Sequence, residues 1–113
     1  MPILTDESRY RILRLIEQNP TISQRHLASA LGISLGKVNF CVNALIKKGI
    51  LKTSSFLNSR NKRAYAYILT PQGMEDKARV TLRFLNRKMD EYEALQREIA
   101  ELTEQARKLK SSD

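Results

Sequence analysis

Residues 22–49 read ISQRHLASALGISLGKVNFCVNALIKKG and contain two helical patterns with a glycine between them. The first pattern begins after Ser23, a residue type that caps helix amino termini. It stops at Gly32, which can adopt the left-handed conformation that often follows a helix. Ser34 caps the second pattern, and Gly49 closes it. Two helices joined by so few residues predict a helix-turn-helix unit.

The segments on either side of this stretch predict another helix and a β-hairpin. Residues 5–18 have apolar residues at helical spacing, with Thr5 as the N-cap. Beyond the second helix the apolar period changes to two, which predicts short strands over residues 50–55 and 64–69. The polar, basic residues 56–63 between them predict the tip of a hairpin.

A long helix is predicted from Thr70-Pro71 to about Lys110, because threonine caps helices and proline is favoured in their first turn. Some of its apolar residues recur every seven positions, the spacing of a coiled-coil seam. So long a helix cannot bury such a stripe on so small a domain, so we expect it to pair with a second copy. The residues expected at this dimer surface are Leu82, Leu85, Met89, Tyr92, Leu95, Ile99, Leu102, Ala106 and Leu109.

The charge is concentrated in the first part of the chain. The formal net charge is +8, and the 11 Lys and Arg before Thr70 face three Asp and Glu, whereas nine of each follow it. No acidic residue lies between Glu17 and Glu75. A merely soluble surface mixes both signs, so a carboxylate-free stretch of this length favours a polyanionic partner such as nucleic acid. A chance run of charge on a solvated surface is the alternative.

An ordered set of motifs runs through the first 75 residues: ISQRHLA at 22–28, LGIS at 31–34, Val38, Leu45, KGIL at 48–51 and LTPQG at 69–73. Together they resemble the winged helix-turn-helix of MarR-type bacterial transcription regulators. The short length and the long carboxy-terminal helix are similar to the subgroup associated with exopolysaccharide gene clusters.

The predicted fold is mainly α with a small β-hairpin. Residues 1–70 are expected to form a winged helix-turn-helix DNA-binding domain, and residues 71–113 a long coiled-coil helix for dimerisation. MarR relatives use helices from both ends of the chain to dimerise and to border a small-molecule pocket. This chain begins just before its first short helix, so the resemblance does not carry that pocket over, and the effector stays unknown.

The second helix of the unit would be the recognition helix, lying in the major groove over Ser34 to Asn43. Asn39 and Asn43 carry the donor and acceptor that can bind adenine bidentately, and Lys37 can reach guanine or a phosphate. The alternative for the two asparagines is a plain solvated helix surface. The residues expected to face DNA from this helix are Ser34, Leu35, Gly36, Lys37, Asn39, Phe40 and Asn43.

Leu35 and Phe40 are apolar where related regulators commonly have polar residues. They either contact thymine methyl groups or pack against the wing, which is the predicted hairpin, and packing is favoured for Phe40. Contacts to the DNA backbone are expected from the front of the first helix of the unit and from the hairpin tip, where arginine could also enter a narrow minor groove. These residues are Ser23, Gln24 and Arg25, and Arg60, Asn61, Lys62 and Arg63.

Other classes of function find little support. The chain lacks a glycine-rich phosphate loop, a nucleophile motif and paired carboxylates within the domain, so we expect no enzyme, and we expect no cofactor. One cysteine, Cys41, and one histidine, His26, cannot supply a structural zinc site. Cys41 is expected to be a small, at least half-buried side chain rather than a redox sensor, and His26 a surface residue. With neither a signal peptide nor a membrane span, we expect a cytoplasmic protein.

The sequence therefore predicts a homodimeric, sequence-specific regulator that binds double-stranded DNA at a pseudo-palindromic operator. The alternative is a protein-interaction adaptor, in which the winged helix docks a partner and the coil scaffolds an assembly. The carboxylate-free stretch argues against the adaptor unless its partner is itself strongly acidic.

Overall fold

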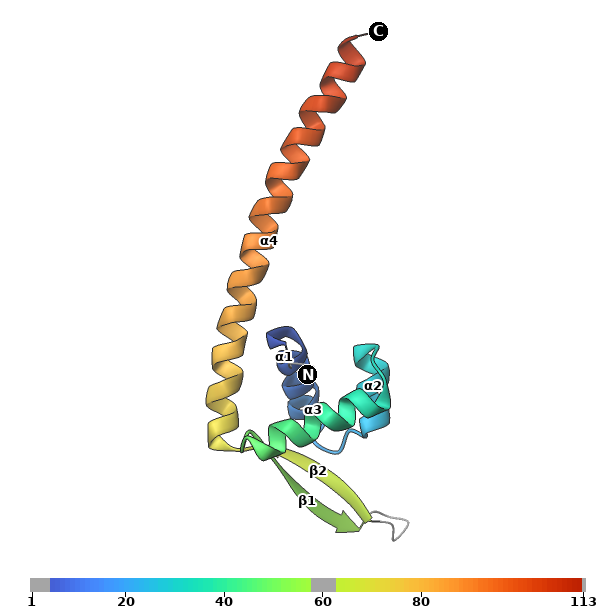
Figure 1. Ribbon diagram of the computed structural model, residues 1–113, viewed down its shortest axis with the longest axis vertical. Coiled ribbons are helices and arrows are strands. Elements are labelled where there is room, and N and C mark those ends of the chain that lie inside the picture. The colour runs from blue at the N-terminus through green and yellow to red at the C-terminus, as the bar shows by residue number, and fades with distance from the viewer. Residues whose placement is uncertain (1–4, 58–62, 113) are drawn as a thin grey trace. The chain divides into compact units, whose positions relative to one another are not determined.

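The computed structural model describes residues 5–57 and 63–112, and the side chains among them outside residues 55–65. Two compact units divide the chain, Met1–Thr81 and Leu82–Asp113. The expected mainly α fold with one small hairpin is confirmed (Figure 1). The elements are α1 (Asp6–Gln18), α2 (Gln24–Leu31), α3 (Leu35–Lys47), β1 (Leu51–Leu57), β2 (Arg63–Leu69) and α4 (Pro71–Ser111).

Local side-chain chemistry sets the helix boundaries, as predicted. The hydroxyls of Thr5, Ser23 and Ser34 each accept the backbone N–H three residues further on, at 3.0–3.1 Å. Each bond satisfies an N–H that has no partner within its own helix. Gly32 ends α2 at φ 68°, a left-handed conformation that costs glycine little. The chain then turns by 110° into α3, within the range of helix-turn-helix units.

One hydrophobic core holds the three amino-terminal helices and the base of the hairpin together. The apolar face of α3 is fully buried in it, as the helical spacing predicts. The buried cluster consists of Ile12, Leu13, Ile16, Ile22, Leu27, Val38, Cys41, Val42, Leu45, Ile50, Leu51 and Tyr67.

The hairpin is longer than the sequence predicted. β1 and β2 pair antiparallel from Leu51 opposite Leu69 to Leu57 opposite Arg63. The expected loop over residues 56–63 is therefore wrong at both ends, and Arg63 is the first residue of β2. The polarity of residues 56–63 was misleading, because any residue except proline can make the backbone hydrogen bonds that hold two strands together.

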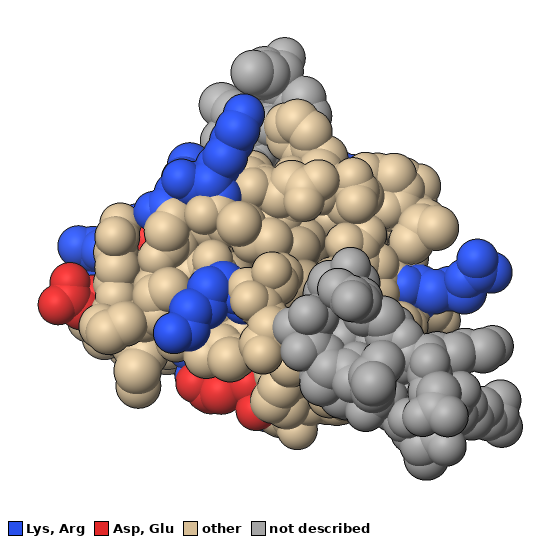
Figure 2. Space-filling model, turned by 90° about the horizontal axis from the view of Figure 1, so that it is seen from below, with Lys and Arg blue, Asp and Glu red and all other residues tan. Residues whose placement is uncertain are grey.

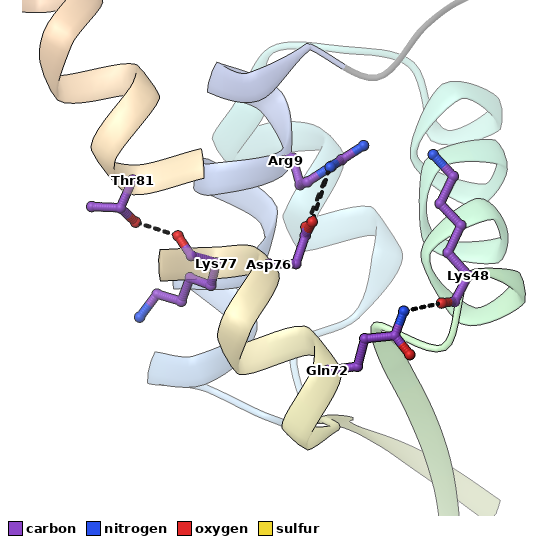
Figure 3. A network of polar contacts seen from close by, with 6 residues as sticks. All are labelled: Arg9, Lys48, Gln72, Asp76, Lys77 and Thr81. Carbon is purple, nitrogen blue, oxygen red and sulfur yellow. Dashed lines mark hydrogen bonds and ion pairs between the residues drawn. The ribbon is translucent and has the colours of Figure 1, made fainter. Parts of the chain in front are cut away.

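The first turns of α4 are fastened to the rest of their unit by polar contacts (Figure 3). Thr70 caps the helix as predicted, since its hydroxyl accepts the N–H of Gly73 at 2.9 Å. The Gln72 amide donates to the carbonyl of Lys48 at 3.2 Å, and Arg9 forms an ion pair with Asp76 at 3.3 Å. These contacts join α4 to the end of α3 and to α1.

The second unit is the remainder of α4, which continues without interruption to Ser111, close to the predicted end. Contacts group the helix up to Thr81 with the first unit, so the predicted division at residue 70 stays a prediction.

Among the described residues, no single helix has the length and hydropathy of a membrane span. The bent pair of α2 and α3 reaches that length and hydropathy only when the two helices are taken together.

Candidate nucleic-acid interface

The outward face of α3 carries the residues predicted to read DNA. All seven of them, from Ser34 to Asn43, are exposed, whereas Val38 and Val42 between them are fully buried. Leu35 and Phe40 are 45% and 44% exposed, although both are apolar. The helix therefore presents two amides, a lysine and two apolar side chains on one surface.

Phe40 lines an open groove along α3. Its neighbours in the groove include Asn39, Asn43 and Gly36. The surface around Gly36 is open, because a Cβ built there would meet no atom within 4 Å. The two interpretations of Phe40, contact with a thymine methyl or packing against the wing, stay predictions, because the hairpin side chains 55–65 lie outside the described set.

The two asparagines belong to a chain of hydrogen bonds that leads into the core. The Asn43 amide donates to Asn39 Oδ1 at 3.1 Å, and the Asn39 amide donates to Gln24 Oε1 at 3.2 Å. The Gln24 amide in turn donates to the Tyr67 hydroxyl at 3.2 Å. The base of the hairpin is thus connected through α2 to the exposed face of α3.

At the front of α2, the structure gives Gln24 contacts within the protein that the sequence did not predict, and the role of these residues on DNA stays a prediction. Arg25 is exposed, as a phosphate contact requires, and the Ser23 hydroxyl caps the helix. Gln24 is half-buried, and both ends of its amide are occupied by Tyr67 and Asn39. Sequence reasoning missed this link because Gln24 and Tyr67 are 43 residues apart and no local pattern connects them.

Those cations of the carboxylate-free stretch whose side chains are described lie on the surface. Figure 2 views the molecule from the side of the hairpin and shows blue side chains spread over that face, with red ones at its edge. In residues 5–54 and 66–112, the ion pairs involve other cations, such as Arg9 with Asp76 and Lys77 with Glu17. The exposed cations in the described part of the stretch are Arg25, Lys37, Lys47, Lys48 and Lys52.

The predicted hairpin contacts are described only in part. Arg60, Asn61 and Lys62 lie outside the described residues. For Arg63 the structure gives the backbone, which pairs with Leu57 at the far end of the hairpin. Their role on DNA stays a prediction.

Cys41 and His26 occupy the ordinary positions expected for them. Cys41 is 5% exposed, and burial raises the pKa of its thiol while the nearby Lys37 charge lowers it less. A buried thiol with a raised pKa is unreactive, which argues against redox sensing. His26 is exposed, and its ring lies 3.2 Å from the Ser23 hydroxyl. In the part of the chain that is described, no three His, Cys, Asp or Glu side chains gather as metal ligands would.

Comparison with known proteins supports the fold. The family described as winged helix-turn-helix DNA-binding matches residues 5–52. No curated protein matches the chain.

Three similar solved structures, of 14 matching chains, illustrate the likeness. The adhesin competence repressor AdcR from Streptococcus pyogenes is 23% identical over 77% of this chain and 62% of its own, with a TM-score of 0.58. A MarR/EmrR family regulator from Acinetobacter sp. ADP1 is 23% identical over 74% and 57%, with a TM-score of 0.59. The repressor CouR, solved bound to a 23-mer DNA duplex, is 24% identical over 73% and 56%, with a TM-score of 0.57.

The chain thus spans between 56% and 62% of the length of these three proteins. At such identities the likeness concerns the fold, and it leaves the exopolysaccharide subgroup a prediction. Together with the match over residues 5–52, it establishes that this chain carries a winged helix-turn-helix and has the fold of MarR-type transcription regulators.

Proposed function

We propose that this protein is a transcription regulator that binds double-stranded DNA. The observation that carries the proposal is the exposed face of α3, which presents two amides and a lysine within a carboxylate-free, helix-turn-helix surface. Amides and cations are the groups that read base edges in a major groove and bind phosphates. No acid occupies the first turn of α2 or α3, so both amino termini favour anions. Such a regulator acts where the chromosome is, so we place it in the cytoplasm.

The proposed contacts divide into two kinds. The recognition helix α3 supplies base contacts, chiefly through its amides, with Lys37 reaching guanine or a phosphate. Arg25 and Ser23 at the front of α2 hold the DNA backbone and fix the register. The hairpin supplies further backbone or minor-groove contacts through Arg60, Asn61, Lys62 and Arg63.

A homodimer formed through α4 completes the proposal. The eight large side chains of the predicted seam are 51–72% exposed in the single chain, and Ala106 is also exposed. Two copies that bury this stripe against each other would carry two recognition helices related by a two-fold axis. We therefore expect a pseudo-palindromic operator with half-sites about 34 Å apart.

The proposal is tested by fluorescence anisotropy of duplex DNA, single-stranded DNA and RNA over a range of salt concentrations. If a dimer contacts about eight phosphates, log affinity for the duplex falls against log salt with a slope of about −7. Preference for the duplex with a steep slope supports the proposal. A protein that ignores duplex DNA at low salt contradicts it and leaves the adaptor as the better hypothesis.

Removing the hairpin cations should weaken binding to every duplex. We expect the triple variant Arg60→Ala, Lys62→Ala, Arg63→Ala to flatten the salt slope by about 0.9 for each phosphate that the hairpin no longer neutralises. The matched control removes the same charge from α4, by Arg97→Ala, Lys108→Ala and Lys110→Ala. An equal change in both variants would show that net charge matters and that the hairpin does not touch DNA.

Gly36→Ala should separate stability from DNA binding. A Cβ at this helical position meets open space, so alanine should raise the free energy of unfolding by about 0.5–1 kcal/mol. If DNA approaches the helix here, the same methyl group should weaken duplex binding about tenfold. Urea denaturation and anisotropy measure the two effects. Unchanged duplex affinity would mean that the DNA does not approach Gly36.

A further inference from the structure

We propose that Asn43 is the base-reading amide of α3 and that Gln24 is a positioning residue that sets which of its atoms faces the groove. The inference rests on the proposed function and deepens it, because it assigns specificity to one amide and explains how that amide is held. It also gives the two asparagines different roles, although both are exposed on the same helix.

The hydrogen bonds of the chain all run in one direction. Asn43 donates to Asn39, Asn39 donates to Gln24, and Gln24 donates to Tyr67. An amide that donates at one end of such a chain must present its oxygen at the other, so the orientation of each amide depends on the next. If one of the three amides rotated, the other two would therefore have to rotate with it to keep their hydrogen bonds.

The inner end of the chain is anchored. Tyr67 is 9% exposed, and its backbone N–H donates to the carbonyl of Pro20 at 2.8 Å. Gln24 lies half-buried in the first turn of α2. Side chains held this way lose little further freedom when DNA binds, which is how preorganised contacts gain affinity and specificity.

At the outer end, no described side chain other than Asn39 bonds the amide of Asn43. Asn43 keeps Oδ1 and one N–H for another partner, and these are the acceptor and donor that bind the N6 and N7 edge of adenine. Asn39 uses its oxygen toward Asn43 and its nitrogen toward Gln24. With the opposite direction, Asn43 would turn both of its N–H groups outward. Asn39 already bonds at both ends of its amide, whereas Asn43 bonds through its nitrogen alone, so we take Asn43 as the reader and adenine as its base.

Two substitutions of Gln24 either keep or remove the direction of the hydrogen bonds from Asn43 toward Tyr67. In Gln24→Glu the carboxylate can only accept, so Asn39 must still donate to it and Asn43 must still present its oxygen. The Tyr67 hydroxyl can then donate to the same carboxylate. In Gln24→Met the length of the side chain is kept, but the link to Asn39 is removed.

The test is selection of binding sequences from randomised duplexes, followed by measurement of relative affinity at each base pair. We expect the native protein to prefer adenine at one position of each half-site, and Asn43→Ala to lower that preference about tenfold. Gln24→Met should lower the preference at the same position about threefold and leave other positions unchanged. Gln24→Glu should weaken binding to all duplexes through its charge, yet keep the preference.

Two comparisons make the result decisive. Gln18→Met, the same change at an exposed residue of α1, should leave the profile unchanged. In the Asn43→Ala background, Gln24→Met should cause no further loss at that position, because it acts through Asn43. If Gln24→Met instead weakens all sequences equally, or if Asn43→Ala leaves every preference intact, the inference is overturned while DNA binding stands. If the native protein enriches no duplex, the proposed function and the inference both fail.

Discussion

Gly73→Ala is expected to destabilise the protein by about 3 kcal/mol, the upper end of what an added methyl group costs in a packed interior. A Cβ at Gly73 would lie 2.1 Å from the carbonyl oxygen of Ile50 and 3.0 Å from its carbonyl carbon. Both atoms belong to the backbone, so no change of rotamer can relieve the clash. Urea denaturation followed by circular dichroism measures the loss.

The neighbouring contacts explain why the backbone cannot move aside. The N–H of Ile50 donates to the carbonyl of Leu45 at 3.0 Å, and the carbonyl of Ile50 accepts the N–H of Thr70 at 3.1 Å. The Thr70 hydroxyl caps α4 and donates to the carbonyl of Gly49, with the carbonyl oxygen of Ile50 also within 3.2 Å. Moving Ile50 would therefore disturb the end of α3, the start of β1 and the cap of α4 together.

Gly36→Ala is the matched control for this prediction. Both glycines lie in the first turn of a helix, and alanine alone favours a helix over glycine by about 1 kcal/mol. The two substitutions should therefore change stability with opposite sign, because one methyl group meets open space and the other meets backbone. If Gly73→Ala is as stable as the native protein, α4 does not approach Ile50 this closely.

The sequence predicted those parts of the fold that depend on neighbouring residues. Thr5, Ser23, Ser34 and Thr70 cap helices because a short side-chain hydroxyl meets an N–H three residues on. The buried face of α3 likewise follows from spacing along one helix.

Contacts between distant segments left no local signal in the sequence. Nothing near Gly73 indicates that the carbonyl of Ile50 lies against it, and nothing near Gln24 points to Tyr67. The ends of the hairpin were misjudged for a related reason, because backbone pairing between Leu57 and Arg63 is independent of their side chains. The candidate site was thus predicted at the level of the exposed face of α3, while the way its amides are held required the structure.

Ile99→Asp is expected to convert a dimer into a monomer, weakening association at least about 100-fold because the two-fold axis introduces the buried charge twice. Ile99 lies within the apolar stripe of α4 and is 53% exposed in the single chain. An interface that covers residue 99 in both copies would have to remove two carboxylates from water, and the residues of the predicted seam include no cation to pair with them. Light scattering after size exclusion, over a range of micromolar concentrations, measures the change.

Ala94→Asp provides the matched control on the same helix. Five residues at 100° each place Ala94 about 140° around the helix from Ile99, away from the stripe. Ala94→Asp introduces the same charge and a larger loss of helix propensity, yet this variant should remain a dimer because the charge lies outside the stripe. Circular dichroism should show similar helix content in both variants, because α4 forms across the same residues in each. If both variants dissociate equally, the added charge or a weakened helix is responsible, and the stripe is not the interface. If the native protein is monomeric at these concentrations, α4 does not pair with a second copy, and the prediction of a two-fold operator has no basis.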